Sequence, residues 1–170
     1  RFTASLIMKL PYEQLIADIL TAQGKTIAIA ESCTGGLVSS MLTDIPGSSN
    51  YIDVNFVTYS YDAKHKYLGV KHETLDVYGA VSPQVAVEMA EGLIKNTNAD
   101  YALSTTGIAG PSGGSDKKPV GLIYIGAASR SKSVAFKHNA NPVLERTLIK
   151  SDFAQHALKA FYEFLKESSK

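Results

Sequence analysis

A short apolar run that ends in a glycine-rich turn is the feature that most restricts how this chain can fold. Residues 26–30 (TIAIA) form this run, which is typical of a strand buried on both faces of a sheet. Residues 31–36 (ESCTGG) follow at once, and residues 37–43 then show helical spacing of apolar side chains. A strand that passes through a tight turn into a helix favours an α/β sheet.

The rest of the chain continues this alternation. Helices are predicted at residues 11–23, 37–43, 62–68, 74–78, 83–96 and 143–166, and strands at 26–30, 54–60, 101–105, 120–128 and 133–137. Residues 129–132 between the last two strands predict a hairpin. The pattern therefore predicts a mixed α/β sheet with helices on both faces.

Length and composition limit the class of protein. With 170 residues, 45% of them hydrophobic, residues 10–170 are expected to form one domain with its own core. Residues 1–9 are expected to be an N-terminal extension, an expression remnant or the tail of a linker. Their apolar stretch is too short for a signal peptide, and no run approaches the roughly 18 residues of a membrane span. The expected compartment is the cytoplasm.

Charge and cysteine content exclude further classes. The net charge is only +1, so nothing indicates a surface that binds nucleic acid. The single cysteine, Cys33, excludes an intrachain disulfide framework and a multi-cysteine metal site. Neither a phosphate-binding P-loop nor a His-Glu-x-x-His zinc motif is present.

Three polar segments follow predicted strand ends, at residues 31–36, 59–64 and 105–114. Open α/β sheets bind ligands beyond the carboxyl ends of their strands, so these segments are expected to converge on one crevice. Ser32 lies between the end of the predicted strand and the start of the predicted helix. Free N–H groups at the helix N-terminus, near Ser32 and Cys33, would bind an anion or an oxyanion.

Alternatives remain open for the nucleophile. Ser32 can be a simple helix cap, and the Gly-x-Ser-x-Gly elbow of many serine hydrolases is absent around it. Cys33 is a rival nucleophile, because helix N-termini lower the pKa of thiols, or it is a small buried hydrophobe.

Candidates for a base are few. Each of the four histidines, His65, His72, His138 and His156, is predicted to be a surface or helix residue. Lys64 is a candidate if burial lowers its pKa, and otherwise it is a solvated helix lysine. The pair Ser129 and Lys132 matches a Ser-x-x-Lys pattern but falls in the predicted hairpin turn.

Taken together, several motifs resemble the CinA C-terminal domain family over about residues 11–165. They are residues 30–37 (AESCTGGL), 43–48 (TDIPGS), 57–60 (VTYS) with 63–64, 68–70 (LGV), 79–82 (GAVS), 106–111 (TGIAGP) with 113–114, and 119–121 (PVG). The resemblance implies a three-layer α/β/α sandwich with a mixed, mostly parallel sheet. It also implies an amidase that hydrolyses nicotinamide mononucleotide to nicotinate mononucleotide and ammonia.

The resemblance also implies site residues. Ser32 would be the nucleophile and Lys64 its base, with Tyr59 assisting. The implied substrate-binding residues are Cys33, Thr34, Gly35, Gly36, Thr106, Gly107, Ala109, Gly110 and Arg146. No metal and no cofactor are implied, and the partners would be a small nucleotide and further copies in a homo-oligomer, with no nucleic acid or membrane required.

Some positions differ from the family pattern. Val54 and Asn55 replace a Gly-Gly pair, Tyr61 replaces Asn, residues 144–146 (LER) replace Gly-Asp-Arg, and Lys150 replaces Arg. These differences concern how tightly the substrate would be bound. They leave open a non-catalytic nucleotide-binding or interaction domain as the alternative function, beside a cysteine hydrolase that uses Cys33.

Overall fold

The computed structural model describes residues 9–170, and within them five strands form one sheet in the order β2–β1–β3–β4–β5. The strands are β1 (Ile27–Glu31), β2 (Ile52–Val57), β3 (Tyr101–Gly107), β4 (Leu122–Ser129) and β5 (Ser133–Asn139). Strand β1 pairs in parallel with β2 and β3, whereas β4 is antiparallel to both β3 and β5. The predicted mixed α/β sheet and its terminal hairpin are confirmed.

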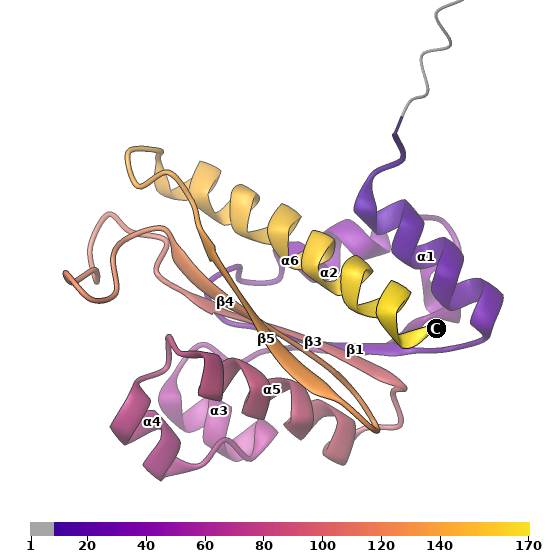
Figure 1. Cartoon of the computed structure of the whole chain (residues 1–170), viewed down its shortest axis with the longest axis horizontal. Helices are drawn as coiled ribbons and strands as arrows, with labels where there is room; N and C mark the ends of the chain where they lie inside the picture. Colours follow the sequence, from indigo (N-terminus) through magenta and orange to yellow (C-terminus); the bar gives the residue numbers. More distant parts are fainter. Residues whose placement is uncertain (1–8) are drawn as a thin grey trace, which may run out of the picture.

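Helices cover both faces of the sheet (Figure 1). One layer contains α1 (Tyr12–Gln23), α2 (Leu37–Thr43) and α6 (Arg146–Ser168), and the other contains α3 (Tyr61–Leu68), α4 (His72–Tyr78) and α5 (Pro83–Asn96). A short 3-10 helix, η1 (Ser48–Asn50), precedes β2. The chain is therefore a three-layer α/β/α sandwich, as expected.

The side chains of strand β1 alternate between the two hydrophobic cores, one on each face of the sheet. Its large side chains, Ile27 and Ile29, pack into the core under α1, α2 and α6, while Ala28 and Ala30 face the core beneath α5. All four are fully buried, which explains the apolar run. Small residues on the α5 side let that helix approach closely. At Gly126 in β4, an added Cβ would lie 2.1 Å from the carbonyl oxygen of Ala86 in α5.

The end of β2 departs from the prediction. The strand was expected to continue to residue 60 but ends at Val57. Thr58 still donates its N–H to the carbonyl of Glu31, at 2.9 Å, and the chain then turns. Ser60 caps the next helix by accepting a hydrogen bond from the N–H of Ala63. Residues 58–60 therefore connect β2 to α3 instead of continuing the strand.

Other boundaries differ by a few residues. Strand β1 includes Glu31, β4 begins at Leu122, and α6 begins at Arg146 rather than at residue 143. The predicted extension at residues 1–9 lies outside the described residues except for Lys9. In the part of the chain that the structure describes, no helix combines the length and apolarity needed to cross a bilayer.

Candidate active site

The carboxyl ends of β1, β2 and β3 meet at one place in the sheet. In register, Ala30 of β1 lies between Phe56 of β2 and Ser104 of β3. Just beyond, the N–H of Ser32 donates to the carbonyl of Thr105 at 3.1 Å. The expected convergence of the polar segments after these strands is confirmed.

Ser32 and Lys64 are in direct contact at this place. The Nζ of Lys64 lies 2.9 Å from the Oγ of Ser32, and it also donates to the main-chain carbonyls of Thr58 at 2.7 Å and Tyr59 at 3.1 Å. Lys64 is only 1% exposed. The alternative of a solvated helix lysine is therefore wrong, because α3 directs this side chain inward to the end of β1.

Burial sets the protonation of this amine. Removal from water lowers the pKa of Lys64 from its ordinary value to about 8. A neutral amine has two N–H donors and one lone pair. The two carbonyls accept the two N–H groups, so the lone pair is left for the hydroxyl proton of Ser32. The geometry suits a lysine that removes a proton from serine.

A fully buried carboxylate, Glu31, holds the turn that carries Ser32. Its Oε1 accepts from the hydroxyl of Thr34 at 2.6 Å and from the N–H of Val38 at 2.9 Å. Its Oε2 accepts from the N–H and the hydroxyl of Ser39, at 2.9 and 2.6 Å. Both oxygens are satisfied by charge-assisted hydrogen bonds. This role of Glu31 was not predicted from the sequence.

Glu31 also changes where an anion can bind. The free N–H groups at the start of α2 were expected to hold one, but those of Val38 and Ser39 already donate to the Glu31 carboxylate. The N–H of Ser32 likewise already donates a hydrogen bond, to the carbonyl of Thr105. Within residues 9–170, the main-chain N–H groups of Cys33, Thr34 and Gly36 donate to no other residue. The donors available for an oxyanion are therefore in the turn rather than in the helix.

Two glycines give the turn its shape. Gly35 and Gly36 have φ angles of +62° and +105°, in the left-handed region that side chains rarely adopt. Gly35 is exposed and Gly36 is half-buried, and the N–H of Gly35 closes the turn by donating to the carbonyl of Ser32 at 3.0 Å. A Cβ built on Gly35 would lie 3.7 Å from the Nζ of Lys150, so a cation of α6 faces the same turn.

Cys33 is part of the hydrophobic core. Its side chain is 5% exposed, and burial raises the pKa of its thiol to about 12. A thiol with this pKa is protonated near neutral pH, and the thiolate is the nucleophilic form. These properties argue against Cys33 as the nucleophile and leave its main-chain N–H as its contribution to the site.

Tyr59 and Arg146 form the outer rim. The Tyr59 side chain is exposed, and its hydroxyl accepts from Nη2 of Arg146 at 3.1 Å, while its carbonyl holds Lys64. Nη1 of Arg146 donates to the carbonyl of Gly110 at 2.6 Å. Arg146, the first residue of α6, thus connects the segment after β2 with the glycine-rich segment after β3.

The glycine-rich segment contributes mainly its backbone. Thr106 is buried, and its hydroxyl donates to the carbonyl of Ala80 at 2.7 Å. Ala109 is buried in the core, while Gly107 and Gly110 have no side chain to offer. The nine residues expected to bind substrate belong to the turn after β1, to the end of β3 (Thr106 and Gly107) and the segment that follows it, and to the start of α6.

Comparison with known proteins gives a consistent family. The model of the CinA C-terminal domain matches residues 9–165. A CinA-like protein of Chloroherpeton thalassium is 48% identical over 161 residues, which is 94% of this chain and 38% of the relative. A CinA-like protein of Endomicrobium trichonymphae is 55% identical over 121 residues, or 71% and 28% of the two chains. The chain thus spans less than two fifths of the length of these curated relatives.

Solved structures share the fold over nearly their whole length. The competence/damage inducible protein CihA of Agrobacterium tumefaciens is 41% identical with a TM-score of 0.83, covering 90% of this chain and 96% of that one. The competence damage-inducible protein A of Klebsiella pneumoniae is 31% identical with a TM-score of 0.85, covering 92% and 98%.

Proposed function

The chain belongs to the CinA C-terminal domain family, and from this premise we propose that it is an amidohydrolase acting through a serine–lysine acyl-enzyme. The substrate that we propose is nicotinamide mononucleotide, and the products are nicotinate mononucleotide and ammonia. One observation carries the proposal. The buried amine of Lys64 lies 2.9 Å from the hydroxyl of Ser32, with its other two hydrogen-bonding positions occupied by main-chain carbonyls.

In the first half-reaction, neutral Lys64 takes the proton of Ser32 as Oγ attacks the carboxamide carbon. The carbonyl π bond opens to an oxyanion. The C–N bond then breaks, and the proton on Lys64 passes to the leaving nitrogen, which departs as ammonia. In the second half-reaction, water attacks the ester, Lys64 accepts its proton, and the acid is released as the proton returns to Ser32.

The oxyanion would be held by the N–H groups of Cys33 and Thr34. They follow Ser32 directly and donate to no other residue in the described chain. Loss of one such donor commonly costs about 3 kcal/mol of transition-state stabilisation. This differs from the expectation that included the N–H of Ser32, because that group is bonded to Thr105.

The nucleotide phosphate would lie between the turn after β1 and the start of α6. Arg146 and Lys150 bring positive charge to this place, and the N–H of Gly36, which donates to no other residue in the described chain, lies in the adjoining turn. Phosphate groups are commonly bound by such a combination of main-chain N–H groups and cations. In this proposal Tyr59 orients Lys64 through its carbonyl. Its hydroxyl can relay a proton to the leaving nitrogen once Arg146 has turned to the phosphate.

Release of ammonia from nicotinamide mononucleotide tests the proposal. We expect the purified chain to release ammonia, and we expect Ser32→Ala and Lys64→Met each to lower kcat at least 1,000-fold, because both remove a reacting group. Ser40→Ala and Lys66→Ala are the matched controls, since both residues are exposed and lie near Ser32 and Lys64 in sequence. Circular dichroism checks that each variant is folded.

The alternative function predicts a different result. A non-catalytic nucleotide-binding domain would bind nicotinamide mononucleotide in a calorimetric titration and release no ammonia. That outcome, or turnover by the Ser32→Ala variant near that of the unsubstituted chain, would overturn the amidase mechanism.

A further inference from the structure

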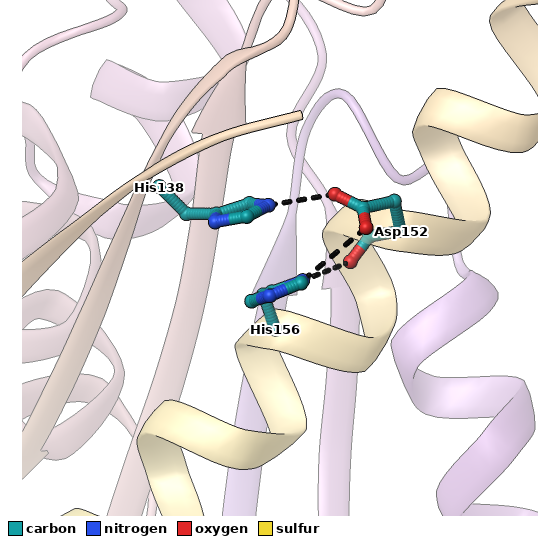
Figure 2. Close-up of side chains that lie close together, drawn as sticks. All are labelled: His138, Asp152 and His156. Atoms are coloured by element: carbon teal, nitrogen blue, oxygen red, sulfur yellow. Dashed lines mark hydrogen bonds and ion pairs between the residues drawn. The ribbon is translucent and has the colours of Figure 1, made fainter. Parts of the chain in front are cut away.

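Three side chains far from each other in sequence lie together between β5 and α6. Asp152 and His156 are one helical turn apart on α6, and His138 reaches them from β5, the strand at the sheet edge (Figure 2). Nε2 of His138 lies 2.6 Å from Oδ2 of Asp152, and Nδ1 of His156 lies 3.5 Å from Oδ1 and 3.0 Å from the main-chain carbonyl oxygen of the same residue. The histidines were predicted to be separate surface or helix residues, so the sequence pattern did not predict this cluster.

The cluster has the donor set of a transition-metal site. One potential ligand atom from each residue lies within 4.8 Å of the others, and among residues 9–170 no other group of three His, Cys, Asp or Glu side chains meets this condition. Two imidazole nitrogens and a carboxylate oxygen are ligands that Zn²⁺ takes readily. All three side chains are between 23% and 35% exposed, so an ion can enter from solvent.

The two imidazoles of the cluster are stacked on each other. Their centroids lie 3.4 Å apart and their planes are 11° apart. A second stacked pair, His65 and His72, has centroids 3.7 Å apart. That pair belongs to no three-ligand cluster in the described chain and therefore offers a natural comparison.

We propose that His138, Asp152 and His156 bind one divalent transition-metal ion, Zn²⁺ in the first instance, which fastens α6 to β5. Around tetrahedral Zn²⁺, with bonds of about 2.0–2.1 Å, ligand atoms lie roughly 3.3–3.5 Å apart. Nδ1 of His156 already has this spacing from Oδ1 of Asp152, and on binding the ion it gives up its hydrogen bond to the main-chain carbonyl of Asp152. To reach this spacing, Nε2 of His138 moves less than about 1 Å away from Oδ2 of Asp152. The two stacked rings tilt away from each other, so that one nitrogen lone pair of each ring points at the ion. Water completes the coordination.

Such an ion would be structural. It would join a helix to an edge strand that is hydrogen-bonded on one side only, to β4. None of its three ligands takes part in the contact between Ser32 and Lys64, so the proposed amidase chemistry does not pass through it. Because the ion binds the folded chain and not the separated elements, its binding stabilises the fold.

Zinc titration of the 170-residue chain, first stripped with a chelator, tests the site. We expect one Zn²⁺ per chain by calorimetry at about pH 7.5, with a Kd on the order of 1 μM or tighter. Saturating Zn²⁺ should raise the melting temperature by about 5 °C or more. His138→Ala, His156→Ala and Asp152→Asn should each weaken binding at least tenfold and remove most of the thermal shift.

His72→Ala is the matched control, because it removes a histidine from the other stacked pair and should leave zinc affinity unchanged. His138→Gln and His156→Gln, which keep side-chain bulk, replace any alanine variant that fails to fold. The proposal is overturned if the unsubstituted chain binds Zn²⁺ no tighter than about 100 μM. It is also overturned if His72→Ala loses as much affinity as His138→Ala, or if the cluster variants bind like the unsubstituted chain.

Discussion

At the scale of single residues, Lys64 makes the proposed activity depend on pH. Its amine is almost completely buried, and burial lowers the pKa to about 8. Only the neutral form can take the Ser32 proton, and the neutral fraction increases as pH rises through this pKa. The protonated amine, which dominates below pH 8, keeps all three of its hydrogen-bond acceptors but has no lone pair.

We therefore expect kcat/KM for ammonia release to rise about tenfold for each pH unit below about 7.5, and to level off above about 8.5. Initial rates between about pH 6 and pH 9.5 give the profile. Circular dichroism over the same range controls for unfolding. A profile that is flat, or that falls as pH rises through 8 while the chain stays folded, would contradict Lys64 as the base.

The sequence alone was enough to propose Ser32 as a nucleophile and Lys64 as its base, but it could not show that the two side chains are in contact. The helix that carries Lys64 is polar, with the sequence YDAKHKYL, and nothing in that pattern distinguishes Lys64 from the exposed Lys66. The carbonyls of Thr58 and Tyr59 hold the buried amine of Lys64, and they are available as acceptors because β2 ends at Val57. Because these acceptors are main-chain groups, they cannot be recognised from the residue types in the sequence.

At the scale of elements, the unit from β1 to α2 is held together by one carboxylate. Glu31 ends the strand and bonds three residues of the turn and helix, Thr34, Val38 and Ser39. The strand, the turn and the helix were all predicted from the sequence. The carboxylate was not, because it caps the helix from inside the preceding strand rather than from the usual cap position, which Gly36 occupies.

We expect Glu31→Gln to lower the free energy of unfolding by about 3 kcal/mol, because the amide NH2 would face donors and the buried charge-assisted bonds would be lost. Urea unfolding followed by circular dichroism measures this change. Glu163→Gln, on an exposed position of α6, should stay within about 0.5 kcal/mol. A Glu31→Gln chain as stable as this control would show that the carboxylate network contributes little.

At the scale of the whole molecule, the close approach of α5 to the sheet depends on small residues. The alternation of helices and strands was sufficient to predict three layers. The order of the strands was not predictable in detail, since the sequence does not state that β1 lies between β2 and β3. Nor could it show that Gly126 faces the main chain of Ala86 across the two layers.

We expect Gly126→Ala to destabilise the fold by about 1–3 kcal/mol, because its Cβ would lie 2.1 Å from a main-chain oxygen and 2.4 Å from the hydroxyl of Ser104. The fall in the urea midpoint relative to Ser131→Ala, a substitution in the exposed hairpin turn, gives the size of the effect. An unchanged midpoint would mean that α5 can move away at no cost.

In the proposed function, the elements that hold the Ser32–Lys64 pair are not those that would contact the phosphate of the ligand. The pair depends on β1, β2, β3 and α3, whereas Arg146 and Lys150 come from the start of α6, at the other end of the chain. Among the positions expected to differ from the family pattern, residues 144, 145 and 150 lie on the second side, whereas Val54, Asn55 and Tyr61 lie in β2 and α3. In the proposed function, substitutions at the start of α6 can therefore alter which ligand is selected while the contact between Ser32 and Lys64 stays unchanged.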